Sequence, residues 1–348
     1  MAQESILVRD RELPVAAVRS FEVVAYDDQH HDAIVRMVAG RIAALRAVVT
    51  AIPDRMIRHD ALCDPLADEL APLLRPDRCR VAVRGTTVVG FLSWHETPNL
   101  RGTGCPGAWS PAHGAAVHRA EHAPAEVHEA LYEAAARAWA ASGRAVLSGS
   151  VLRGHDREHQ TWVINGFGRF LHDAVIPLPP ARTIRHTDMT IRRATLDDVP
   201  VLADLEREHS AHYTDPPVFM VPPEPADADE LVAFLGAEPN SIWVAADDVG
   251  PQAYLRFEAR SDGATPILHS PTTISITGAF TRPELRGRYV ADALLLTAMT
   301  HYAALGFERV AIDHETTNPP ARRFWGPRSQ LVAVSYLRVL ERPPGVNA

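Results

Sequence analysis

The second half of the chain switches between two-residue and helical spacing of its apolar residues. Residues 189–195 alternate apolar and polar positions, which predicts a strand, and Asp197 or Asp198 is placed to cap a helix to about His212. An apolar segment over 290–305 predicts a long helix that stops at Gly306. The other predicted elements are a short helix near 229–235, strands at 241–246, 252–258, 274–280, 309–314 and 331–340, and a helix near 320–325. The predicted order is βααβββαβαβ.

The first half repeats this order with weaker patterning. Its predicted elements are a strand at 21–25, an amphipathic helix at 32–50, a hairpin of 80–83 and 88–95, a strand segment at 108–116, a helix at 125–141 and a strand at 144–151. The proline-rich segment 176–188 breaks the periodicity and separates the halves. Because 348 residues suit two domains better than one, we predict domains at 20–178 and 189–348. A linker at 179–188 and an N-terminal arm at 1–19 complete the division.

A candidate anion site lies where the strand at 274–280 is followed by a tight turn and the helix at 290–305. The first turn of a helix carries unpaired N–H groups and partial positive charge. Arg286, Gly287 and Arg288 add two cations and close access to the backbone. This arrangement suits a pyrophosphate group.

The same stretch carries a family resemblance. Residues 286–291, Arg-Gly-Arg-Tyr-Val-Ala, resemble the acyl-CoA loop of the GCN5-related N-acetyltransferases (GNATs), whose pattern is Arg/Gln-x-x-Gly-x-Gly/Ala. The first and last positions match, and Tyr289 stands where the family has glycine. Residues 318–325, Asn-Pro-Pro-Ala-Arg-Arg-Phe-Trp, match a second motif of the family, Asn-x-x-Ala-x-x-Phe-aromatic.

The resemblance implies an α/β fold with a mixed sheet, built as two tandem GNAT-fold domains. Residues 162–168 of the first half resemble the aromatic-x-x-x-Gly-Phe signature near the end of this fold. The corresponding turn at 118–122 has no glycine, and Glu121 would repel a phosphate. We therefore expect the N-terminal domain to be a degenerate copy that does not hold CoA.

The co-substrate implied by the resemblance is acetyl-CoA or another acyl-CoA. Backbone groups at Phe280 and Thr281 would line the pantetheine arm and polarise the thioester. The residues expected to bind the cofactor are Phe280, Thr281, Arg286, Gly287, Arg288, Tyr289, Val290, Ala291, Asn318 and Phe324.

Catalysis needs groups that transfer protons, and one expected group is missing. The family often has a tyrosine as general acid after the phenylalanine of the second motif, but Trp325 stands here and an indole cannot replace a phenol in that role. Candidates are His314 and Glu315 at the end of the strand at 309–314, followed by Glu258 on a neighbouring strand. Adjacent strand residues face opposite ways, so only one of His314 and Glu315 is expected to reach the cleft.

Composition narrows the function further. The net charge of −8 argues against nucleic-acid binding, and no run approaches the ~20 apolar residues of a membrane span. The N-terminus lacks the order of a secretory signal and the three cysteines form no CxxC, so a cytoplasmic location is expected. Every one of the 35 cations is arginine, which excludes Schiff-base and Walker-A lysine chemistry. The close histidine spacings have no third ligand, so no metal is expected.

The sequence therefore predicts an N-acetyltransferase that acts on the amine of a small polar metabolite or natural product, as in secondary metabolism. Direct attack of the amine on the thioester is expected, in a monomer or homodimer. Two alternatives remain. The protein could be a GNAT-fold ligand-binding or scaffold protein without catalysis, or an enzyme with different chemistry in the groove for pantetheine.

Overall fold

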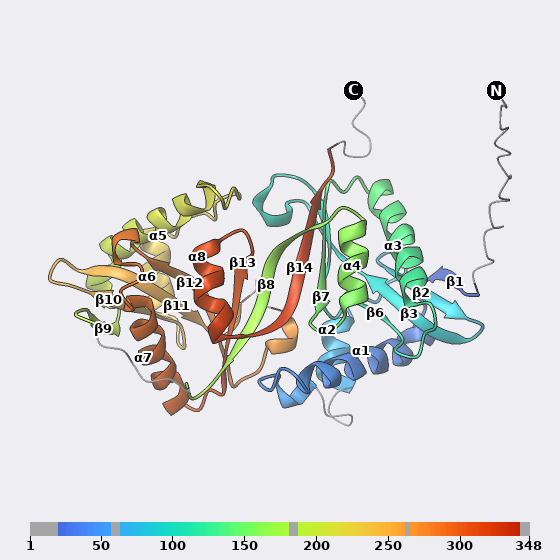
Figure 1. The fold of residues 1–348 in the computed structure, drawn as a ribbon, viewed down its shortest axis with the longest axis horizontal. Coiled ribbons are helices and arrows are strands. Elements are labelled where there is room, and N and C mark those ends of the chain that lie inside the picture. The colour runs from blue at the N-terminus through green and yellow to red at the C-terminus, as the bar shows by residue number, and fades with distance from the viewer. Residues whose placement is uncertain (1–19, 57–62, 181–186, 262–264, 342–348) are drawn as a thin grey trace, which may run out of the picture.

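The computed structural model describes residues 20–56, 63–180, 187–261 and 265–341 (Figure 1). The predicted arm at 1–19 and most of the predicted linker lie outside these residues. The first half contains β1 (Glu22–Ala25), α1 (His31–Arg46), α2 (Cys63–Leu70), β2 (Cys79–Arg84), β3 (Thr87–Ser93), β4 (His95–Thr97), β5 (Gly107–Ser110), β6 (Ala115–Val117), α3 (Pro124–Ala141), β7 (Val146–Leu152), α4 (Asp156–Ile164) and β8 (Gly168–Pro177).

The second half has the predicted order βααβββαβαβ, which confirms that part of the sequence analysis. Its elements are β9 (Thr190–Arg193), α5 (Val199–Thr214), α6 (Ala228–Leu235), β10 (Ser241–Ala246), β11 (Pro251–Glu258), β12 (Thr273–Thr281), α7 (Val290–Ala304), β13 (Arg309–Glu315), α8 (Pro319–Trp325) and β14 (Gln330–Val339). Gly306 follows α7 with a φ of 90°, the left-handed conformation that ends a helix at little steric cost.

Three local predictions differ from the structure. The segment 108–116 is not one strand but two, β5 and β6, which join different sheets across the turn at Pro111–Gly114. The proline-rich segment does not begin to separate the halves at Ile176, because β8 continues to Pro177, which is paired with Arg309. Asp198 is the N-cap residue of α5, as predicted, but its side chain makes no capping hydrogen bond to that helix. The Asp198 carboxylate instead accepts a hydrogen bond from the amide of Thr195, one turn earlier.

The strands form two sheets. One has four strands in the order β1-β2-β3-β6, and the other has ten in the order β4-β5-β7-β14-β8-β13-β12-β11-β10-β9. The large sheet runs through both halves of the chain, so the two halves share one continuous hydrogen-bonded layer.

The last strand of each half pairs with strands of the other half. In the centre of Figure 1, β14 lies between β7 and β8, and β8 lies between β14 and β13. The C-terminal strand thus pairs along β7, from Ala333 opposite Leu152 to Val339 opposite Val146. Strand β8 pairs in return along the whole of β13. This reciprocal exchange joins the two halves through backbone hydrogen bonds as well as side chains.

Alternating residues build a core on each face of the second half. On β10, Trp243 and Ala245 pack with α7, whereas Ile242 and Val244 pack with α5 and α6. The exchanged strand contributes to the first half in the same way. Val332 and Ala333 belong to the core beneath α1 and α2, and Tyr336 belongs to the core beneath α3.

Candidate active site

A cavity of about 540 Å³ lies where the N-terminus of α7, the end of β12 and helix α8 meet. It exists because two neighbouring strands separate. β12 and β13 pair in parallel only from Thr273 opposite Arg309 to Ser275 opposite Ala311. Beyond that point β12 pairs with β11, and β13 pairs with β8. The resulting wedge is open to the helices on both faces of the sheet.

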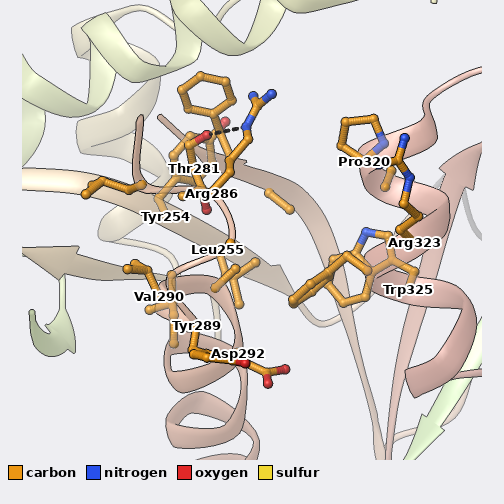
Figure 2. A pocket seen from close by; sticks show the side chains of 18 of the residues that line it. Tyr254, Leu255, Thr281, Arg286, Tyr289, Val290, Asp292, Pro320, Arg323 and Trp325 are labelled. Carbon is orange, nitrogen blue, oxygen red and sulfur yellow. Dashed lines mark hydrogen bonds between the residues drawn. The ribbon is translucent and has the colours of Figure 1, made fainter. Parts of the chain in front are cut away.

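The loop before α7 forms one wall of the cavity. Arg286 donates from Nε to the carbonyl of Thr281 at 3.0 Å, and its guanidinium carbon lies 5.8 Å from the centre of the Phe280 ring. Figure 2 shows this hydrogen bond and the position of Arg286 above the cavity. Burial lowers the pKa of Arg286, but a guanidinium remains charged at neutral pH. The terminal nitrogens can therefore bind an anion.

Two residues of this loop have left-handed backbone conformations. Gly287 has a φ of 79°, and no atom lies within 4 Å of where its Cβ would be. Tyr289 has a φ of 61° and precedes the first turn of α7. The tyrosine thus keeps the backbone shape for which the family uses glycine, and its side chain is half exposed at the edge of the cavity. Among the described residues, no side chain caps α7.

Helix α8 forms the opposite wall, where Figure 2 shows Pro320, Arg323 and Trp325. Asn318 begins this helix and accepts a hydrogen bond from the amide of Ala321 at 3.2 Å. Arg328 follows α8 and joins it to α7 through an ion pair with Asp292 at 2.6 Å. This pair leaves Arg286 and Arg323 to give the cavity its positive character.

Helix α5 and strand β11 supply a third group of lining residues, which the sequence analysis missed. His209, His212 and Tyr254 all line the cavity. The Nδ1 atom of His209 lies 2.8 Å from the hydroxyl of Tyr254, and its ring lies 5.6 Å from that of Phe280. A sequence signal did exist, since Tyr254, Arg256 and Glu258 place polar groups on every second position of an otherwise apolar strand.

Nine of the ten residues expected to bind the cofactor line this cavity. They are Phe280, Thr281, Arg286, Gly287, Tyr289, Val290, Ala291, Asn318 and Phe324. Arg288 is exposed and does not line it. The two motifs that were recognised 30 residues apart therefore come together on one cavity, while their contact with a cofactor remains a prediction.

The three candidate proton-transfer residues lie outside the cavity lining. His314 faces the side of α8, where its ring is 5.2 Å from that of His172, and Glu315 faces α5. Glu258 accepts a hydrogen bond from the Thr277 hydroxyl at 2.5 Å and lies 3.6 Å from the Nε of Arg256. Their catalytic roles stay predictions.

Glu315 belongs to an acidic cluster where the two halves meet. Asp173 of β8 is paired with Asp313 of β13, and Arg101 of the first half lies 3.8 Å from Glu315. Burial, and then the charge of Glu315, raises the pKa of Asp313 to about 6. Burial likewise raises the pKa of Asp173 well above its usual range. The two buried aspartates therefore favour the protonated form more than free carboxylates do.

Neither a metal centre nor a membrane span is evident in the described part of the chain. Residues 20–56, 63–180, 187–261 and 265–341 contain no group of three or more histidine, cysteine or acidic residues arranged to hold an ion. The helices within these ranges are too short or too polar to cross a bilayer.

Comparison with known proteins agrees with this geometry. Residues 203–327 match the model of the acetyltransferase (GNAT) family. A GCN5-related N-acetyltransferase from Sphaerobacter thermophilus has a similar structure, with a TM-score of 0.57 and 14% identity over 95% of this chain and 98% of that chain. A tandem GNAT protein from the clavulanic acid biosynthesis pathway matches with a TM-score of 0.49 and 13% identity over 94% of this chain and all of that one. A search of curated proteins finds no match.

Residues 203–327 of the second half therefore match the GNAT family model. Over almost its whole length the chain has the fold of the Sphaerobacter acetyltransferase. The mixed α/β fold and the family predicted from the sequence are confirmed.

Proposed function

We propose that the protein is an acyl-CoA-dependent N-acyltransferase whose second half holds acetyl-CoA or a similar acyl-CoA and whose acceptor is the amine of a small molecule. The observation that carries the proposal is the single cavity formed by the Arg286–Val290 loop, the start of α7 and the Asn318 end of α8. Both family motifs line it, together with the separated strand end at Phe280.

The residues present fit a bound CoA. A diphosphate needs donors and cations, and the first turn of α7 offers backbone N–H groups beside Arg286. Gly287 has no side chain, and the space where its Cβ would lie is open. A phosphate can therefore approach the backbone closely at this position. The apolar wall at Phe324 and Trp325 suits the pantetheine arm.

When bound, an acyl-CoA supplies an activated acyl group as a thioester. The chain then has to hold that group at the separated strand ends and accept a proton from the amine. Phe280 and Thr281 offer backbone groups at the separated end of β12.

Calorimetric titration with acetyl-CoA tests the proposal. The wild type should bind, and Arg286→Ala should weaken binding by about 1–3 kcal/mol, or roughly 5- to 150-fold, because a charged hydrogen bond to phosphate is lost. Arg119→Ala is the matched control, since Arg119 lies in the corresponding turn of the first half. A loss caused by Arg119→Ala with Arg286→Ala silent would place the site in the other half.

Wild-type protein that does not bind acetyl-CoA would favour an alternative function for this cavity. In that case the same titration with Tyr289→Gly becomes informative. Binding gained by this variant would identify Tyr289 as the block and the wild type as a GNAT-fold protein that has abandoned CoA.

A further inference from the structure

Three polar side chains follow one another along the α5 wall of the cavity. His209 of α5 is half-buried, lines the cavity and lies 2.8 Å through Nδ1 from the hydroxyl of Tyr254. Tyr254 of β11 is 1% exposed, and it lies beside Glu206, one turn before His209 on α5. The series therefore runs from a buried carboxyl group to the surface of the cavity.

The strand next to β11 makes room for this arrangement. A Cβ at Gly278 would lie 3.2 Å from a ring carbon of Tyr254 and 3.6 Å from its hydroxyl. The absence of a side chain at Gly278 thus allows the phenol to lie flat against β12. On its other side, the ring of His209 packs at an angle of 32° to that of Phe280.

The chemistry of the three groups sets the direction of the hydrogen bonds. Burial raises the pKa of Glu206, and Arg256, 3.7 Å away, partly offsets that effect. An ionised carboxylate only accepts, and Glu206 Oε1 is a buried oxygen to which no side chain of the described residues donates. A Tyr254 hydroxyl directed at this oxygen leaves its own oxygen to accept from the Nδ1–H of His209. The Nε2 atom of that imidazole is left with a free lone pair.

We propose that Glu206 and Tyr254 are positioning residues that fix the tautomer of His209, and that His209 Nε2 is the general base of the transfer. This inference rests on the proposed function. It adds a residue group to the site that lies inside the cavity, unlike His314, Glu315 and Glu258.

The surroundings of His209 agree with a neutral imidazole. Burial, followed by charge interactions with His212, Arg256 and Arg286, lowers the pKa of His209 to about 4. The other titratable groups that face it are Glu206, Tyr213 and Tyr254. Phosphates bound by Arg286 would remove part of that positive charge and make the imidazole a stronger base.

The proton balance is complete with groups already named. The amine nitrogen forms a bond to the acyl carbon, the bond from that carbon to sulfur breaks, and the nitrogen loses one proton to Nε2 of His209. The imidazolium then returns this proton to the departing thiolate, which leaves as a thiol. No oxidant, reductant or metal is needed.

Nitrogen NMR of the histidine side chains tests the relay in the protein without any ligand. At pH 7, His209 should show a protonated Nδ1 and an unprotonated Nε2, with its signals assigned by their loss in His209→Gln. Tyr254→Phe should shift His209 towards the Nε2–H tautomer, which an unconstrained imidazole prefers, and leave the signals of His212 unchanged. An Nε2–H or doubly protonated His209 in the wild type would overturn the proposal, as would a tautomer unaffected by Tyr254→Phe.

Kinetics test the role of the base, with water as the acceptor and release of CoA thiol from saturating acetyl-CoA as the readout. His209→Gln should lower kcat at least 100-fold, with acetyl-CoA affinity changed by no more than about twofold. His212→Gln, which removes a histidine from the same wall without breaking the hydrogen bond to Tyr254, should lower kcat less than tenfold. Wild-type kcat in His209→Gln would contradict the proposal, and so would a wild type that binds acetyl-CoA but releases no thiol. Failure of the wild type to bind acetyl-CoA would instead reject the proposed function, while the tautomer result would stand.

Discussion

The two halves share a plan, but within the described residues the cavity beside their helices is large in the second half and very small in the first. In the second half the wedge beside α7 and α8 encloses about 540 Å³. In the first half the space among α3, α4, β6 and β7 is about 10 Å³, no more than one water molecule needs. The fold alone therefore does not make the site. A few side chains decide whether the wedge is open.

The anion site of the first half is occupied by the chain itself. The Glu121 carboxylate accepts a hydrogen bond from the amide of Ala123, directly before α3, and pairs with Arg84 at 3.0 Å. The sequence analysis expected Glu121 to repel a phosphate. The structure adds that this carboxylate is held by the amide of Ala123 and by Arg84, in the turn that precedes α3.

The centre of the same wedge is filled by longer side chains. Arg41 is the eleventh residue of α1, as His209 is of α5, but Arg41 crosses to α4 and pairs with Glu158 at 2.5 Å. On the other side, Trp162 packs so closely on Gly149 that a Cβ there would lie 2.3 Å from the indole. The same helix position is thus occupied by Arg41, which fills the space in the first half, and by His209, which lines the cavity in the second half.

The largest expected effect comes from removing the strand that joins the halves. A chain that ends at residue 329 lacks β14, and with it Val332, Ala333 and Tyr336 from the two cores of the first half. We expect this truncation to abolish the cooperative fold of both halves, a loss of the whole ~5–15 kcal/mol typical of a domain. Circular dichroism with urea titration measures it.

A chain that ends at residue 341 is the matched control, because it keeps all of β14. It should unfold like the full-length protein, in one transition rather than two. If the chain ending at 329 retained a cooperative transition for either half, the exchanged strands would not couple the halves as their pairing suggests.

The second largest effect concerns the buried ion pair between Arg41 and Glu158. Glu158→Gln leaves the guanidinium of Arg41, which is 3% exposed, without its counter-charge. We expect unfolding free energy to fall by about 3–5 kcal/mol, as for other broken buried ion pairs. Glu133→Gln breaks the exposed pair with Arg137 on α3 and should cost at most about 1 kcal/mol.

The pair of Arg41 and Glu158 also predicts that the free energy of unfolding depends on pH. Burial raises the pKa of Glu158, but Arg41 and then His128 outweigh it, so that the pKa falls to about 2. A folded-state pKa below the ordinary value of 4.5 stabilises the fold fully above pH 4.5 and loses that effect as pH falls towards 2. The stability difference between wild type and Glu158→Gln should therefore shrink over this range. A difference that grows in acid would contradict the assignment.

Local pattern was enough to predict most of the fold and the cofactor side of the site. The alternation at 189–195 and the apolar segment at 290–305 each reflect burial on a face of one element, so β9 and α7 followed directly. The loop at 286–291 could be recognised because its chemistry is contiguous in the sequence. His314 and Glu315 face opposite sides of β13, as the two-residue period predicted.

The rest depends on contacts between distant segments. The pairing of β14 with β7 joins residues about 180 positions apart, and nothing in the apolar pattern of β14 distinguishes that partner from a neighbour in its own half. The same holds for His209 and Tyr254, whose contact requires the packing of α5 on β11. A turn separates β5 from β6, and the two strands join different sheets. The sheet that each strand joins depends on contacts with distant strands.

The smallest expected effect concerns Tyr289, which replaces the glycine of the loop motif in the second half, just as the corresponding turn of the first half has no glycine. Tyr289→Gly removes a left-handed tyrosine, whose strain costs ~1–2 kcal/mol, but glycine loses more entropy on folding. We expect a net change in unfolding free energy within about 1 kcal/mol and an acetyl-CoA affinity within a factor of a few, by urea titration and calorimetry. Tyr289→Ala keeps the strained backbone without the phenol, so it separates the two contributions. Should glycine create binding that wild type and alanine both lack, the backbone shape of this loop would be the barrier. The second half would then be as unable to hold CoA as the first, despite its open cavity.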